Sequence, residues 1–340
     1  MKRGLIILLS GIIGIVLVSC TGSQKKAENE AYVKDSADAI ALLNKAGTLF
    51  GKIADKMPGS ENDTPGLIAL GEKLFHDVSL SENNSESCNT CHMLDAGKFG
   101  VDNKPTSPGV KGQNGTRNSP TVLDAGFQLA QFWDGRAADL KEQAKGPVLN
   151  PIEMGMPDEK FVVNKIGSIA EYKDIFTKAY PGQEDPITYD NIANAIAAFE
   201  RTLITHNRFD EFVKGDWKAL DANERKGLET FINTGCIACH LTPLLGGQMY
   251  QKMGLVNPYE NTKDLGRYEV TKNEQDKYLF KVPMLRNIAE TYPYFHDGAI
   301  ANLDEAIKKM AWLQLGKQYT PEETAWVKAF FTSLTGTVRK

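Results

Sequence analysis

Apolar residues recur at helical spacing through most of the chain, and few segments alternate with the period of a strand. Thr64 and Pro65 have the residue types of an N-cap and a first-turn proline, so one helix is expected to begin there. Asp190, Asp221 and Thr320 each precede a segment whose apolar positions step by three and four. We predict helices after all three. The pattern therefore predicts an all-α, mainly helical protein.

A short motif, Cys-x-x-Cys-His, occurs twice in this helical pattern. It is the attachment site of a c-type haem, in which two thiols become thioethers on the porphyrin and the histidine becomes the proximal iron ligand. With only 5 Cys and 5 His in 340 residues, a chance repeat of this motif is not credible. The sequence therefore predicts two covalently bound haem c groups, held by Cys88, Cys91 and His92 and by Cys236, Cys239 and His240.

The two motifs lie far enough apart for each haem to have a domain of its own. In both cases a helical segment leads into the motif and a loop-rich segment follows it, as in a small cytochrome c. We predict two cytochrome c-like haem domains in tandem, comprising residues 38–203 and 204–336. Which of the two the last helix packs on is left open at this point.

The N-terminus departs from the helical pattern. Two basic residues precede an apolar run that ends in Ser19 and Cys20, which is typical of a bacterial lipoprotein signal peptide. The alternative is a transmembrane anchor, but the run is shorter than the ~20 residues that a spanning helix needs. We expect residues 1–19 to be the signal peptide, Cys20 to carry lipid, and the polar residues 20–37 to form a flexible tether. Thr21 after the cysteine favours the outer membrane.

The cysteines and the net charge limit the classes of function that the protein can have. Cys20 and the two haem pairs account for all 5 cysteines, so no thiol is left for a disulfide or a nucleophile. Covalent haem attachment and the signal peptide both indicate the periplasm, with the membrane contacted only through the lipid. The formal net charge is −4 at pH 7, which implies no nucleic-acid binding.

The second axial ligand decides what each haem does, because an iron with two strong ligands transfers electrons and an open one binds substrate. Met310 lies late in the second domain on a segment of helical period, and Met253 and Met284 compete with it on composition alone. The spare histidines are more simply explained as structural residues; they are His76, His206 and His296.

From Lys73 to the C-terminus, the sequence resembles the bacterial di-haem cytochrome c peroxidases. The matching blocks are residues 87–92, 100–107, 117–123, 131–137, 140–147, 152–154, 282–288 and 292–298. The resemblance implies a peroxide-reducing haem in the N-terminal domain and an electron-accepting haem in the C-terminal one. It also implies hydrogen peroxide as the substrate, a small periplasmic cytochrome c or copper protein as the electron donor, and a homodimer.

The resemblance also assigns roles to individual side chains. Met310 matches the axial methionine opposite His240, a pairing that raises the haem potential. Trp133 matches the tryptophan between the haems. Glu153 matches the distal glutamate, which we expect to act as a general acid and base with a pKa raised by the apolar haem pocket. Gln143 matches a glutamine that lines the same pocket.

A calcium site at the domain junction is implied as well. Asn118 and the backbone carbonyls of Thr291 and Pro293 match its ligands, and oxygen donors suit this hard cation.

One departure from the family pattern affects the mechanism. In many members a loop histidine blocks the peroxidatic iron until the other haem is reduced, and counting from Gly100 to Asn118 places that position at Val110. Valine has no lone pair, and Lys111 would ligate only if it were deprotonated. We therefore predict that peroxide turnover needs no obligatory reductive activation.

Two other functions stay open at this point. A di-haem enzyme that oxidises tryptophan on a partner protein would also have an open first haem, but such enzymes carry a tyrosine in place of Met310. A non-catalytic di-haem electron carrier would need two ligands at both irons.

Overall fold

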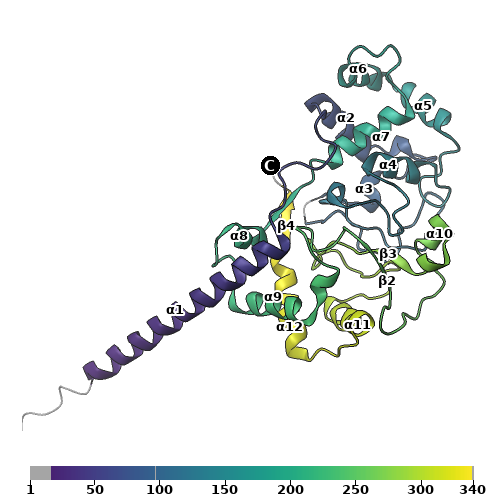
Figure 1. The fold of residues 1–340 in the computed structure, drawn as a ribbon. Coiled ribbons are helices and arrows are strands. Elements are labelled where there is room, and N and C mark those ends of the chain that lie inside the picture. Colours follow the sequence, from purple (N-terminus) through teal and green to yellow (C-terminus); the bar gives the residue numbers. More distant parts are fainter. Residues whose placement is uncertain (1–16, 96, 339–340) are drawn as a thin grey trace, which may run out of the picture.

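The computed structural model describes residues 17–95 and 97–338, and it is mainly helical (Figure 1). The expected fold class is confirmed. Its helices are α1 (Leu17–Phe50), α2 (Pro65–His76), α3 (Cys88–Cys91), α4 (Leu140–Leu149), α5 (Glu159–Gly167), α6 (Ala170–Ala179), α7 (Tyr189–Glu200), α8 (Arg208–Lys214), α9 (Ala222–Thr234), α10 (Tyr268–Thr271), α11 (Leu303–Leu315) and α12 (Pro321–Ser333). Its strands are β1 (Thr205–Asn207), β2 (Tyr250–Lys252), β3 (Leu279–Lys281) and β4 (Gly336–Val338).

Capping residues set the helix starts largely as predicted. Thr64 caps α2, while Asp221 and Thr320 form capping boxes at the starts of α9 and α12. The prediction that Asp190 caps a helix was wrong. The cap of α7 is Thr188, whose hydroxyl accepts a hydrogen bond from the backbone N–H of Asn191 at 3.0 Å, and Asp190 lies in the first turn.

Each haem motif follows one member of a tightly crossed helix pair. A Cβ atom at Gly71 of α2 would lie 1.8 Å from the carbonyl oxygen of Ala195 in α7. A Cβ atom at Gly227 of α9 would lie 1.9 Å from the carbonyl oxygen of Trp326 in α12. Only glycine permits such close backbone approach, and it occurs in both halves. The structure therefore contains two similar helix pairs, one for each haem motif.

Two hydrophobic cores correspond to these pairs. The first contains apolar residues of α2, α4, α5, α6 and α7, and the second those of α8, α9, α11 and α12. The last helix therefore packs on the second domain. After α12, strand β4 pairs antiparallel with β1, placing Val338 opposite Thr205, and Val338 packs against the first core.

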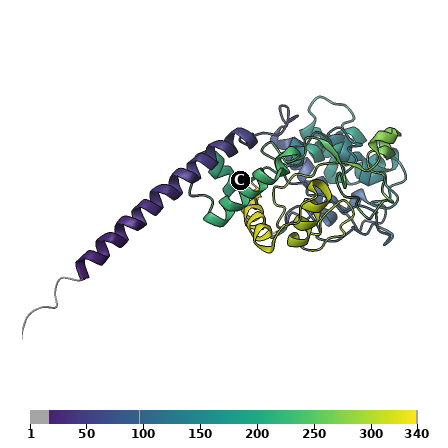
Figure 2. The same cartoon turned by 60° about the horizontal axis from the view of Figure 1, so that its bottom comes forward.

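Helix α1 replaces the expected tether. It runs without a break through residues 20–37, where a flexible segment was predicted, and projects from the body of the molecule (Figures 1 and 2). The segment is polar, but it is rich in the helix formers Gln, Lys, Ala and Glu, and polarity alone does not distinguish a helix from a coil. Residues 1–16 of the predicted signal peptide lie outside the described residues, and so does the side chain of Cys20. No helix in the described ranges is long and apolar enough to span a membrane.

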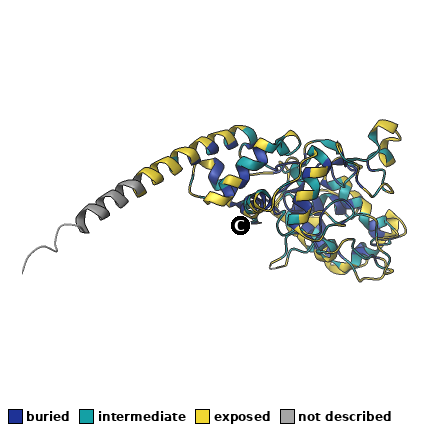
Figure 3. Cartoon of the chain, turned by 90° about the horizontal axis from the view of Figure 1, so that it is seen from below, coloured by how far each residue is buried: buried dark blue, intermediate teal, exposed yellow. Residues whose placement is uncertain are grey.

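The C-terminal half of α1 belongs to the second core. Leu42, Ala46 and Phe50 are buried there, whereas the domain limits proposed from the sequence placed them in the first domain. Asp35 also pairs with Arg225 of α9 at 2.5 Å. Figure 3 shows buried residues on this part of the helix and exposed ones farther from the body.

A buried arginine joins the two domains. The guanidinium of Arg286 donates to Asp124 of the first domain at 3.0 Å and to Asp210 of α8 at 2.8 and 2.9 Å. It also donates to the carbonyl of Thr205 at 2.8 Å. The side chains of Arg286 and Asp124 are 0% exposed, and that of Asp210 is 4% exposed. This network fixes how the two helical cores sit against each other.

Removing this arginine leaves two buried carboxylates without a counter-ion. We expect Arg286→Met to lower the free energy of unfolding by about 3–5 kcal/mol. Guanidinium denaturation followed by circular dichroism measures the loss. The control is Lys328→Met, which breaks an exposed ion pair with Asp304 and is expected to cost less than about 1 kcal/mol. Equal losses in the two variants would contradict the role of the junction.

Candidate haem sites

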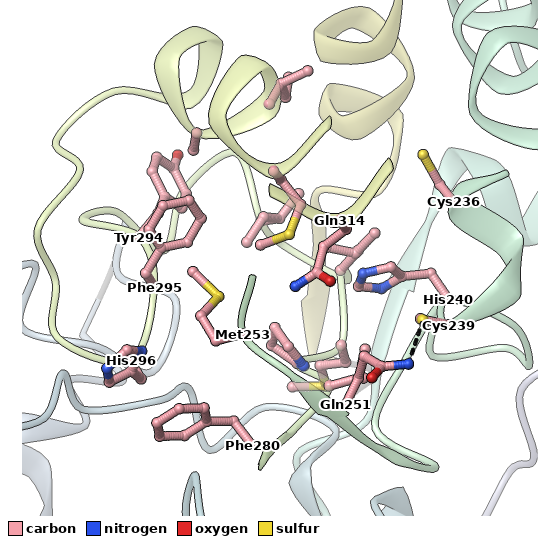
Figure 4. Close-up of a pocket in the computed structure, with 18 of the residues that line it drawn as sticks. Cys236, Cys239, His240, Gln251, Met253, Phe280, Tyr294, Phe295, His296 and Gln314 are labelled. Carbon is pink, nitrogen blue, oxygen red and sulfur yellow. Dashed lines mark hydrogen bonds between the residues drawn. The ribbon is translucent and has the colours of Figure 1, made fainter. Parts of the chain in front are cut away.

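The second Cys-x-x-Cys-His motif forms part of the wall of a large cavity. Helix α9 ends at Thr234 and is followed by Gly235, which has a φ of 106°. The chain then turns so that Cys236, Cys239 and His240 all line the cavity. The cavity has a volume of about 340 Å³, and most of its other lining residues are apolar. Figure 4 shows the two thiols and the imidazole on the same side of it.

His240 is prepared to bind a metal through one nitrogen. Its Nδ1 lies 2.7 Å from the carbonyl oxygen of Leu245, which leaves Nε2 free. Burial lowers the pKa of His240 to about 4, so the imidazole is neutral and its lone pair is available at neutral pH. Two thiols and a free imidazole nitrogen on one apolar cavity fit a covalently attached haem.

The structure brings all three candidate methionines to this cavity. Met253, Met284 and Met310 line it together with His240, and Met310 comes from α11. Placement alone therefore does not rank them.

The first motif forms a separate short helix, α3. Ser87 and Thr90 close a capping box at its start, and the backbone N–H of His92 bonds to the carbonyl of Cys88 at 2.9 Å. Burial lowers the pKa of His92, and its Nδ1 has no hydrogen-bond partner in the described part of the chain. A neutral buried imidazole beside two free thiols again suits a covalent haem.

Glu153 lies in the turn that follows α4, within electrostatic reach of this motif. Burial raises the pKa of Glu153, and the positive charge of Arg136 and a hydrogen bond with Asn150 only partly oppose it. Burial also raises the pKa of Cys91 to about 11, and the charge of Glu153 contributes to that rise. Gln143 lies half-buried on α4, but its side chain makes no hydrogen bond within the described residues.

The loop with Val110 is docked against Glu153. The backbone N–H of Val110 bonds to the carbonyl of Glu153 at 2.9 Å, and a Cβ at Gly109 would lie 1.8 Å from the carbonyl oxygen of Ile152. Lys111 points elsewhere, because its ammonium pairs with Glu82 at 2.9 Å on the surface. The residue beside Glu153 is thus a valine, and the neighbouring lysine is engaged in an ion pair.

Trp133 lies between the surroundings of the two motifs. Its ring lines the second cavity, and its Nε1 donates to the carbonyl of Asn118 at 2.8 Å. The ring also packs edge-on against His296, with centroids 6.4 Å apart.

In the same loop as Trp133, Arg136 stacks on Phe132 at 3.5 Å and acts electrostatically on Glu153. This loop therefore connects the Glu153 region to the second cavity.

Known proteins share this arrangement. The family model of di-haem cytochrome c peroxidases matches residues 65–218. A cytochrome c551 peroxidase from Pseudomonas aeruginosa is 46% identical over 317 residues, which cover 90% of this chain and 90% of the relative. The chain belongs to the di-haem cytochrome c peroxidase family.

Other comparisons agree with this assignment. A cytochrome c551 peroxidase from Nitrosomonas europaea is 46% identical over 272 residues, covering 79% of this chain and 80% of the relative. Among solved structures, a MauG-like protein associated with microbial copper homeostasis has a TM-score of 0.74 and 26% identity, covering 83% of this chain and 93% of that one. The di-haem peroxidases are haem enzymes, and membership implies one haem c at each motif.

The predicted calcium ligands also lie together. Asn118, Thr291 and Pro293 all line the second cavity. The side-chain amide of Asn103 holds the segment that contains Thr291 by donating to the carbonyls of Glu290 and Tyr292, both at 2.9 Å. The described residues contain no group of three or more His, Cys, Asp or Glu that could hold a metal ion. The expected calcium ligands are an Asn side chain and two backbone carbonyls, which are not members of such a group.

The spare histidines divide into two kinds in this di-haem peroxidase. His76 is exposed at the end of α2, and His206 pairs with Glu211 beside β1, as structural residues do. His296 instead is 2% exposed and lines the second cavity, where Lys281 lies as well. Sequence reasoning missed both as site residues, although His296 falls within the matching block at 292–298.

Substituting the methionines one at a time ranks them as ligands. We expect Met310→Leu to convert the second haem from a low-spin to a high-spin form, because leucine has no lone pair to donate. The matched controls Met253→Leu and Met284→Leu remove a sulfur from the same cavity and are expected to keep the low-spin signal. Electron paramagnetic resonance and near-infrared magnetic circular dichroism measure the change. Loss of methionine ligation in a control, but not in Met310→Leu, would reassign the ligand.

Proposed function

We propose that this protein reduces hydrogen peroxide to water with electrons from a small periplasmic cytochrome c or copper protein, and that it needs no obligatory reductive activation. The second part is supported by Val110, which is docked beside Glu153. Counting from Gly100 to Asn118 matches this residue to the blocking histidine of many family members. Membership of the di-haem peroxidase family supports the first part.

The reaction consumes one peroxide, two electrons and two protons and releases two waters. Cys88, Cys91 and His92 would hold the haem that binds peroxide, Cys236, Cys239 and His240 would hold the second haem, and each haem would supply one of the two electrons. Glu153 accepts the proton from one peroxide oxygen on its carboxylate and delivers it to the other oxygen as the O–O bond breaks. Its raised pKa suits both steps, because the group exchanges protons closer to neutral pH than an exposed glutamate does.

Other side chains position this chemistry. Gln143, on the helix that leads to Glu153, orients the peroxide, and the docked Val110 loop limits the access of water. Trp133 would provide the electron path between the haems, and His240 and Met310 would ligate the haem where electrons enter. Met310 on the cavity wall supports a peroxidase over the tryptophan-oxidising alternative, and an open first haem distinguishes both enzymes from an electron carrier.

Location and assembly complete the proposal. Lipid on Cys20 anchors the protein at the periplasmic face of the outer membrane, and α1 carries the haem body away from the lipid surface. Calcium binds at Asn118, Thr291 and Pro293 on the junction between the domains. The working form is a homodimer.

Glu153 is tested by removing its ability to carry a proton. We expect Glu153→Gln to lower kcat for peroxide by about 10²–10⁴-fold with both haems retained. In the parent protein, activity is expected to fall as the pH drops through the raised Glu153 pKa, above the ordinary glutamate value, because the protonated acid accepts no proton. The pH profile of the glutamine variant is expected to lack this fall in activity. The control Glu159→Gln changes an exposed glutamate and is expected to keep full activity. Full activity in Glu153→Gln would refute this role.

The open first haem is tested in the fully ferric protein. We expect electron paramagnetic resonance to show one high-spin haem, and peroxide turnover to begin without pre-reduction. Val110→His is expected to make the first haem low-spin and to impose a reduction step, while the control Val110→Leu leaves both properties unchanged. Two low-spin ferric haems in the parent protein, with turnover only after reduction, would disprove the absence of activation.

A further inference from the structure

A buried lysine on the second haem cavity has no acidic partner. Lys281, at the end of β3, is 6% exposed and lines the cavity. Its ammonium donates to the side-chain oxygen of Gln128, and no carboxylate within the described residues pairs with it. Burial lowers its pKa to about 8. An ammonium removed from water without a counter-ion is costly, so an anion at this position would resolve the imbalance.

A buried histidine on the same cavity has an unused nitrogen. His296 is 2% exposed, and its Nε2 has no hydrogen-bond partner among the described residues. The ring is held in place by stacking on Phe280, with centroids 4.2 Å apart and planes 20° apart, and by the edge of Trp133. Buried polar atoms are rarely left unpaired, so an orphan on a cavity wall points to a group inside the cavity.

His296 belongs to the side of the cavity that faces away from the thiols. Figure 4 shows His296 and Phe280 at one side, and Cys236, Cys239 and His240 at the other. Lys281 lines the same cavity, and its ammonium bonds to Gln128, which lines it as well. In a c-type haem the thioether bonds and the two propionate carboxylates occupy opposite edges of the porphyrin. A haem attached through these cysteines therefore directs its carboxylates toward this side.

We propose that Lys281 and His296 bind the propionates of the second haem. The lysine supplies a positive charge, and the histidine supplies one N–H donor that stacking holds in place. The positive charge favours the ferrous state, as electron entry requires, because reduction adds a negative charge nearby. This inference rests on haem attachment at the second motif and not on the peroxide reaction, so the two proposals fail separately.

The charge is tested by Lys281→Met, which keeps most of the side-chain length. Spectroelectrochemistry of the complete two-haem protein is expected to show at least a tenfold shift of the second haem toward the ferric state, a potential about 59 mV lower. The control Lys252→Met removes an exposed lysine from β2, the strand paired with β3, and is expected to shift the potential much less. A pyridine haemochrome assay first confirms that each variant still contains two haems. Absence of haem from both motifs of the parent protein would refute the family-based proposal instead.

The donor is tested by His296→Phe, which keeps a ring against Phe280 but has no N–H group. The propionate bending bands in the resonance Raman spectrum are expected to move toward a weaker hydrogen bond. The control His206→Phe changes a histidine in β1, outside the cavity, and is expected to leave the bands in place. If Lys281→Met fails to fold, His296→Phe decides the outcome alone. Unchanged Raman bands in His296→Phe, or an unchanged potential in a folded Lys281→Met, would overturn the proposal.

Discussion

The buried guanidinium of Arg286 is the interaction on which the relation between the two domains depends. It is shared between Asp124 of the first domain and Asp210 of the second. Separating the domains would therefore leave at least one buried charge without its counter-ion. A second arginine works in the same way nearer the haem sites. Arg117 pairs with Asp134 at 2.5 Å and with Asp264 at 2.6 Å, and Asp134 follows Trp133 directly. The Arg117 cluster therefore ties the tryptophan loop to the segment that contains Asp264.

Two copies of one motif acquire different chemistry from what surrounds them. At the first, the docked loop presents Val110 and the buried acid Glu153, so the environment favours substrate and proton transfer. At the second, three methionines line the same cavity as the neutral His240, which suits the proposed methionine-ligated haem that transfers electrons. Local sequence fixes where each haem is attached, and tertiary packing decides its function.

The same division explains how much the sequence predicts. Capping residues such as Thr64 and Thr320 and the haem motifs act locally, so their positions follow from short patterns. The placement of Leu42 and Phe50 in the second core depends on contacts with distant helices, which periodicity cannot assign to a domain. Lys281 and His296 are likewise ordinary residues in the sequence. Their significance is that both are buried on one cavity. Within the described residues Lys281 pairs with no carboxylate and the Nε2 of His296 has no hydrogen-bond partner, which only the three-dimensional structure shows.

Hydrogen bonds connect Lys281 and His296 to Trp133, the residue proposed as the electron path. The Nε1 of Trp133 donates to the carbonyl of Asn118, whose own N–H donates to the carbonyl of His296 at 2.8 Å. The N–H of Lys281 donates to the carbonyl of Trp133, also at 2.8 Å. The hydrogen bonds of Lys281, Asn118 and His296 thus hold the backbone and ring of Trp133, the proposed electron bridge. Binding the second haem at this edge would order the groups that orient Trp133, so haem attachment and the electron path are built as one unit.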